Sequence, residues 1–291
     1  MQRISRPVIV AALATLLAPE GLPADPLVVP DTAPSATADA HLQDILRSLR
    51  WVRGPATVDV GAVAHVRLAE GFVMLDPAEA RRFLELMHNP SKGREYLLAP
   101  ASLHWFALLE YADTGYVRDG DTVDATAVLT AITKAADAAN VERRARGWPE
   151  FHVKGWRSPP AYDAHARSLE WATDGESNGV VVTNVLTKIL GREGVTSAVL
   201  VSSPDGLGEA MPAFKQALTG FEYTAGHRYA EFRAGDRTAD YGLAGLFDGG
   251  TAAVPSTSAI SKALWIFLAT GAAVAAVVAF SATRRRGAGG A

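Results

Sequence analysis

The stretch HVKGWRSPPAYDAHARSLEWATDGESNGVVVTNVLTKILGREGVTSAVLVSS, residues 152–203, decides the fold. Runs rich in β-branched and aromatic residues alternate in it with short groups of Gly, Pro, Asn and Asp, which favour turns. The pattern predicts a four-strand antiparallel meander, with strands at residues 152–157, 167–172, 179–190 and 195–202. The expected turns are at residues 158–160, 174–175 together with 178–179, and 191–194.

Helices are expected before and after this meander in the sequence, and they would cover one or both faces of the sheet. Asp76 precedes Pro77 and is followed three positions later by Glu79, which is typical of a helix N-terminus. Asp121 is expected to cap a long alanine-rich helix over residues 122–146. Apolar spacing predicts further helices from His41, after Ser203, and over residues 239–247. Other strands are expected at residues 57–75 (two strands), 103–111 and 228–232.

Both ends of the chain are hydrophobic. Two arginines and an apolar run over residues 8–18 predict a signal peptide at residues 1–24, with an uncleaved anchor or a buried helix as the alternative. Residues 263–282 carry no charge and are followed by three arginines at 284–286, which predicts a transmembrane helix with its tail in the cytoplasm. The remaining segments are expected to be a linker at 25–38, a domain at 39–249, a second linker at 250–262, and the tail at 283–291.

The predicted fold class is therefore α+β: an antiparallel sheet, the four-strand meander, packed with helices, plus one C-terminal transmembrane helix. The terminal segments predict a single-pass protein of the bacterial inner membrane, with the domain outside the cytoplasm, in the periplasm. The lipid bilayer is then one expected partner, and another protein of the cell envelope is a second.

Composition excludes several classes of function. The chain has no cysteine, so it has no disulfide framework, thiolate metal site or cysteine nucleophile. The whole chain carries a net charge of −3. When the six basic residues and the one acidic residue of the two ends are set aside, the middle domain carries about −8. Binding to nucleic acid needs a positive surface, so we exclude nucleic acid as a partner.

Several short motifs occur in a fixed order along the middle of the chain. They are Gly155-Trp156, Pro159-Pro160 with Tyr162-Asp163, Leu169-Glu170-Trp171-Ala172, Asn184, residues 190–195 and residues 226–232. In this order they resemble a bacterial family of membrane-anchored proteins that carry a domain of unknown function, domain of unknown function 2167. The likeness covers residues 50–249 and departs from the family at Val185, where tyrosine or asparagine is expected. The resemblance implies the same layout of signal peptide and C-terminal span, and it implies no activity.

Known catalytic motifs are absent from the sequence. There is no G-x-S-x-G, no H-E-x-x-H and no P-loop, and Gly206-x-Gly208 lacks the third glycine of a dinucleotide-binding loop. Asp163 and His165 could be metal ligands or an acid/base pair, but they follow two prolines where an exposed loop is expected. Asp119, Asp121 and Asp124 lack the rest of a calcium loop, so helix capping explains them better. The sequence predicts no cofactor and no metal.

The candidate binding residues each have a structural alternative. Trp156, Tyr162 and Trp171 could line a carbohydrate- or peptide-binding cleft or belong to the core, where aromatic residues of strands more often lie. Arg192 could clamp an anion or face water in a hairpin turn. His227 and Tyr229 could act as an acid/base pair or be structural. The residues predicted to bind a partner or ligand are Trp156, Tyr162, Asp163, Arg192, His227 and Tyr229.

These observations favour a domain that binds a partner protein or senses the state of the cell envelope. The absence of catalytic motifs argues against an enzyme, although a membrane-tethered hydrolase remains an alternative. A module that binds a small ligand through Trp156 and Tyr162 is the other alternative.

Overall fold

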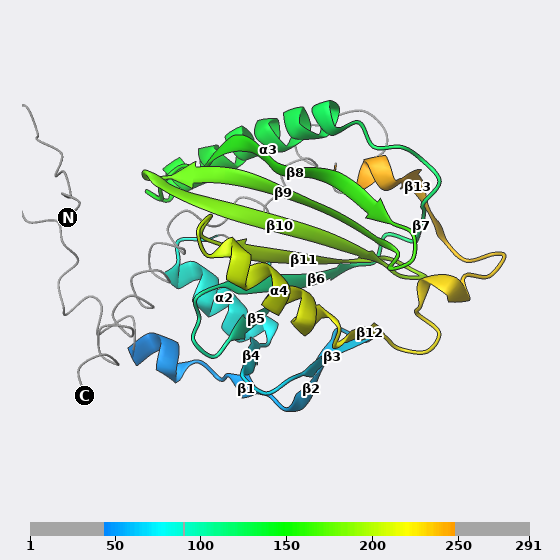
Figure 1. Cartoon of the computed structure of the whole chain (residues 1–291), viewed down its shortest axis with the longest axis horizontal. Coiled ribbons are helices and arrows are strands. Elements are labelled where there is room, and N and C mark those ends of the chain that lie inside the picture. Colours follow the sequence, from blue (N-terminus) through cyan, green and yellow to red (C-terminus); the bar gives the residue numbers. More distant parts are fainter. Residues whose placement is uncertain (1–43, 90, 248–291) are drawn as a thin grey trace, which may run out of the picture. The chain divides into compact units, whose positions relative to one another are not determined.

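The computed structural model describes residues 44–89 and 91–247, and its main feature is one eight-stranded antiparallel sheet (Figure 1). The strand order is β1-β4-β5-β6-β11-β10-β9-β8. These strands are β1 (Val52–Arg53), β4 (Phe72–Leu75), β5 (Tyr96–Pro100), β6 (Phe106–Ala112), β8 (His152–Asp163), β9 (Ser168–Ser177), β10 (Val180–Leu190) and β11 (Val195–Ser202).

The predicted fold class is wrong in its balance of sheet and helix. The four meander strands exist, as β8 to β11, but they are half of an eight-stranded sheet, and the helices are few. Within the described residues, none of the helices is long and apolar enough to cross a membrane. The predicted signal peptide at 1–24 and the predicted span at 263–282 lie outside those residues.

Two smaller sheets and a few helices complete the described structure. The three-stranded sheet contains β2 (Ala56–Val60), β3 (Ala64–Leu68) and β12 (Phe221–Tyr223), and the parallel two-stranded sheet contains β7 (Tyr116–Arg118) and β13 (Thr238–Gly242). The helices are a short one at residues 44–48, α2 (Pro77–Leu86), α3 (Ala125–Ala145), α4 (Leu207–Leu218), and the 3-10 helices η1 (Tyr229–Glu231) and η2 (Leu243–Phe247).

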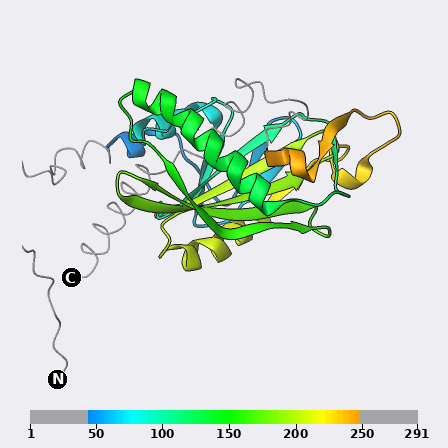
Figure 2. The same cartoon turned by 90° about the horizontal axis from the view of Figure 1, so that it is seen from above.

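Helices and the three-stranded sheet bury both faces of the large sheet. On one face, α2 and α3 pack through Phe83 and Ile132 against a core that includes Trp171. On the other face, Phe214 of α4 packs with Val66 of the three-stranded sheet. Figure 2 shows α3 and α4 on opposite sides of the large sheet. Because both faces are covered, all residues of β11 are buried, including the polar Thr196, Ser197 and Ser202.

Strand β8 corrects the predicted turn at residues 158–160. It continues through Pro159 and Pro160 to Asp163, with register shifts beside the prolines. Proline has no N–H to donate, but β8 is the edge of the sheet and pairs only with β9, so the strand tolerates it. The true turn of the next hairpin is Asn178-Gly179, both with positive φ, while Gly175 lies inside β9 against the Phe151 ring.

Several predicted helix and strand boundaries are also corrected. The cap at Asp76 is confirmed, since its Oδ1 accepts from the Glu79 N–H at 2.9 Å. Asp124 rather than Asp121 caps α3, accepting from the Thr126 N–H at 2.8 Å. Residues 57–75 form three strands rather than two, residues 228–232 contain η1 rather than a strand, and residues 239–247 contain most of β13 followed by η2 rather than a helix.

Candidate functional site

The candidate site lies at the end of the large sheet where two hairpin turns meet. These turns, at residues 164–167 and 191–194, are adjacent because the Leu190 N–H donates to the Arg167 carbonyl at 2.9 Å. Residues 224–242 and strand β7 lie against the same end, since Gly191 bridges to Arg228 and β7 pairs with β13. We call this region the turn end.

Asp119, which follows β7, contacts both sides of the turn between β8 and β9. Its carboxylate accepts a hydrogen bond from the Tyr162 hydroxyl at 2.6 Å and forms an ion pair with Arg167. Burial opposes ionisation of Asp119, but the hydrogen bonds from Tyr162 and Arg167 outweigh it, so the pKa of this carboxyl is lowered. Burial and the same carboxylate raise the pKa of Tyr162 to about 12. The pair is therefore held as a carboxylate and a neutral phenol.

Three aromatic rings form a stack beside Asp119. The Tyr116 ring lies between Tyr229, at a centroid distance of 4.4 Å, and Phe232, at 4.1 Å. The Arg167 guanidinium lies 5.2 Å from the Tyr229 ring, and the Tyr229 hydroxyl donates to the Val117 carbonyl at 3.0 Å. Phe232 is 37% exposed although it is a large apolar residue. We call Tyr116, Tyr229 and Phe232 the aromatic stack.

The loop that carries Phe232 is held by charged hydrogen bonds. Arg192 forms a bidentate ion pair with Asp236, with both distances 2.7 Å, and donates to the Gly226 carbonyl at 3.1 Å. The hydrogen bonds from Arg192 lower the pKa of Asp236 to about 2. The Glu231 carboxylate accepts from the backbone N–H groups of residues 226 and 228. These contacts fix the backbone on both sides of Phe232.

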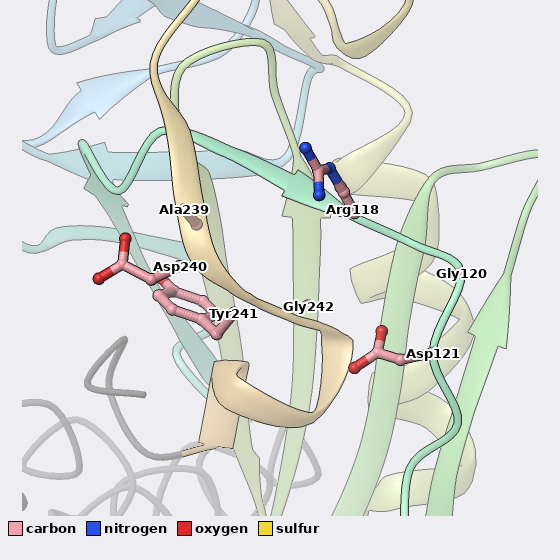
Figure 3. Close-up of a pocket in the computed structure, with 7 residues that line it drawn as sticks. All are labelled: Arg118, Gly120, Asp121, Ala239, Asp240, Tyr241 and Gly242. Carbon is pink, nitrogen blue, oxygen red and sulfur yellow. The ribbon is translucent and has the colours of Figure 1, made fainter. Parts of the chain in front are cut away.

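A hollow of about 370 Å³ opens between β7 and β13 (Figure 3). Arg118, Gly120 and Asp121 line it from β7 and the loop that follows, and residues 239–242 line it from β13. Both Asp121 oxygens accept from backbone N–H groups of η2, and a Cβ on Gly242 would come within 2.5 Å of that carboxylate. In the part of the chain that the structure describes, the Arg118 guanidinium makes no ion pair and no hydrogen bond.

A second hollow of about 370 Å³ lies beneath the 164–167 turn. Its lining includes Glu170, which receives the Lys215 amine at 3.2 Å and the Thr187 hydroxyl at 3.3 Å. Asp163 and Tyr162 also line it. The other lining residues are Ala161, Ala166, Ser168 and Leu218. The Glu170 carboxylate and the Lys215 amine of this hollow already form an ion pair with each other, so they offer little charge to a ligand.

The structure brings five of the six predicted binding residues to the turn end. Tyr162 and Tyr229 lie close to Asp119, and Asp163 turns the chain by accepting from the N–H groups of residues 165 and 166. His227 forms a pair with Glu193 at 2.9 Å, and its carbonyl accepts from the Arg192 N–H. Trp156 lies elsewhere, on β8 opposite Thr173 and partly buried against the core.

Sequence reasoning missed Asp119, Arg167, Phe232 and Arg118 as members of this region. Phe232 closes the motif at residues 226–232, which could have drawn attention to it. The sequence pattern favours helix capping for Asp119, whereas in the structure its carboxylate accepts a hydrogen bond from the Tyr162 hydroxyl. Trp171, expected in the core, is 1% exposed there. Among the described residues no three His, Asp or Glu side chains are placed to hold a metal ion.

Comparison with known proteins identifies a family but no activity. A family model described as "Protein of unknown function (DUF2167)" matches residues 52–281. No curated protein matches the sequence. The solution structure of cyanobacterial PsbP (CyanoP) from Synechocystis sp. PCC 6803 has 10% sequence identity and covers 60% of this chain and 92% of its own. Its TM-score is 0.35, and this similarity does not identify a function.

Proposed function

We propose that this chain, which belongs to the DUF2167 family of proteins of unknown function, binds a partner protein through its turn end. The observation that carries the proposal is the aromatic stack, which presents an exposed Phe232 ring on a loop fixed by charged hydrogen bonds. Interfaces obtain most of their affinity from a few aromatic and arginine residues that are ordered before binding.

The loop geometry explains why Phe232 suits this role. The inner face of its ring already stacks on Tyr116, so binding would not have to immobilise a freely rotating side chain. Arg192 and Asp236 hold the loop, so the backbone is ordered as well. A partner would then gain the burial of the outer face of the ring without the cost of ordering it.

Charge indicates the chemistry of the partner. Arg167, Arg192 and Arg237 at the turn end all have acidic partners within the fold. Arg118, on the same short strand as Tyr116, has none among the described residues and borders an open hollow. We therefore infer a partner surface that places an apolar side chain on Phe232 and a carboxylate near Arg118.

Catalysis at the turn end is a weaker interpretation. Its acidic and basic side chains already form hydrogen bonds with each other. Asp119 accepts from the Tyr162 hydroxyl, and His227 pairs with Glu193. A nucleophile activated by one of these groups would have to displace an internal hydrogen bond first.

The same proposal places the protein at the bacterial inner membrane, with this domain outside the cytoplasm and facing an envelope protein. This location rests on the terminal sequences alone, namely the apolar run near the N-terminus and the three arginines at 284–286.

Photocrosslinking in cells tests the proposal. A photoreactive phenylalanine analogue would replace Phe232 in the full-length chain, and the matched control would carry it at Val141, which is 61% exposed on α3. We expect one recurrent protein adduct from position 232, absent at 141 and lost on Arg118→Glu. Equal or absent adducts at the two positions would refute a partner site at the turn end.

A further inference from the structure

A serine, a histidine and a glutamate meet at the opposite end of the large sheet from the turn end. The turn between β5 and β6 carries Ser102 and His104, and the Ser102 Oγ lies 2.6 Å from the His104 Nδ1. The Nε2 atom of the same ring lies 3.6 Å from the Glu209 Oε1. Glu209 is in the first turn of α4, about a hundred positions further along the chain, so the fold alone brings it to this turn.

The backbone between the serine and the histidine has an unusual conformation. Leu103 has a φ of 56°, a left-handed conformation that is uncommon for residues other than glycine. Its N–H donates to the Pro100 carbonyl at 2.9 Å, which closes a tight turn. Residues in such conformations concentrate at functional sites, where the surrounding structure holds them. Here the turn brings the side chains of residues 102 and 104 within hydrogen-bond distance.

All three side chains are at least partly exposed, although the His104 Nε2 atom itself is buried. The side chain of His104 is 25% exposed and that of Glu209 is 66% exposed, while Ser102 is half-buried. The Nε2 atom makes no hydrogen bond to the described residues, so the Glu209 carboxylate is placed to accept its proton. A small rotation of this exposed side chain would shorten the 3.6 Å contact to a hydrogen bond.

We propose that Ser102, His104 and Glu209 form a catalytic group that hydrolyses acyl esters. His104 in its neutral form, with the proton on Nε2 directed at Glu209, accepts the Ser102 hydroxyl proton on Nδ1. The Ser102 oxygen bonds to the ester carbonyl carbon, and the imidazolium then gives its proton to the departing alkoxide. Water attacks the acyl-serine carbonyl carbon and passes a proton to Nδ1. The bond between that carbon and the Ser102 oxygen then breaks, Nδ1 returns the proton to this oxygen, and the carboxylic acid leaves. No oxidant or cofactor is needed.

Labelling with a fluorophosphonate, followed by peptide mass spectrometry, tests the proposal on the purified full-length chain. We expect the adduct on Ser102, no adduct in Ser102→Ala, and labelling slowed by about 10²- to 10⁴-fold in His104→Gln. Glu209→Gln should slow it by about fivefold or less, because the carboxylate is exposed. The matched control is Ser203→Ala, which removes a hydroxyl that accepts a hydrogen bond from the Gly206 N–H.

Hydrolysis of a p-nitrophenyl ester by the same variants should follow the labelling rates. Histidine alone can react with such esters, so the position of the adduct decides. An adduct at another residue, no adduct, or labelling that is unchanged in Ser102→Ala or His104→Gln would overturn the assignment. Because Ser102 and His104 lie on a surface turn, both variants should unfold at the same urea concentration as the wild type.

Discussion

Replacing Asp119 with asparagine should loosen the turn end by a measurable amount. Asparagine keeps the shape and one acceptor oxygen but removes the charge that Tyr162 and Arg167 contact. A hydrogen bond to a charged group contributes about 1.5–3 kcal/mol, and a neutral one about 0.5–1.5 kcal/mol. The change therefore removes about 1 kcal/mol for each of the two donors.

Solvent reduces the second contribution. The Arg167 side chain is 46% exposed, so water screens its ion pair with Asp119. We expect Asp119→Asn to lower the free energy of unfolding by about 1–1.5 kcal/mol at pH 7, measured by urea titration of the full-length chain. The matched control is Asp137→Asn on the exposed side of α3, which should change it by less than about 0.5 kcal/mol.

The pH dependence gives a second, independent check. The pKa of Asp119 is lower in the folded chain than in the unfolded chain, where a carboxyl has a pKa of about 3.9. Its stabilisation is therefore present above that value and is lost as the pH falls through the folded pKa. The difference between wild type and Asp119→Asn should shrink between pH 6 and pH 3. A difference below about 0.5 kcal/mol at pH 7, or one that persists in acid, would refute this account of the cluster.

Three other changes test the core. Asn140→Ala should lower the free energy of unfolding by about 2–4 kcal/mol in urea titration, because it leaves the buried N–H and carbonyl of Phe151 without their 2.9 Å partners; a loss under 1 kcal/mol would contradict this. Gly175→Ala should cost about 1–3 kcal/mol in the same assay, since its Cβ would lie 2.0 Å from the Phe151 ring; Gly179→Ala, which has open space but a positive φ, separates crowding from backbone strain. Burial lowers the pKa of Lys188 to about 8, below its unfolded value of about 10.4, so the unfolded chain binds more protons between these values and stability should rise with pH from 7.5 to 9.5. Lys188→Met should abolish that rise, and an unchanged slope would show that another group causes it.

The local sequence predicted those parts of the fold that depend on neighbouring residues. The four strands of the meander follow from alternating runs and turn residues, and the start of α2 follows from Asp76 and Pro77. Patterns of this kind fix which residues are buried and where the chain turns. The absence of cysteine likewise excludes disulfides from composition alone, and the acidic middle domain predicts that nucleic acid is not a partner.

Tertiary contacts decided the rest, because they join residues whose separation leaves no local pattern. Prolines predicted a turn at residues 158–160, yet β8 continues there because its outer edge needs no N–H donors. Thr238 begins a strand only because Tyr116 pairs with it across more than a hundred residues. Long-range contacts likewise create the turn end and the cluster of Ser102, His104 and Glu209.

Asp119, Tyr162 and Tyr229 come from three distant segments, and Glu209 reaches His104 only through the packing of α4. Each of these residues has an unremarkable local sequence, and its chemistry arises only when a distant partner lies within hydrogen-bond or ion-pair distance. Sequence patterning fixes burial and turns at short range, whereas a polar site is defined by which long-range contacts form once the sheet has closed.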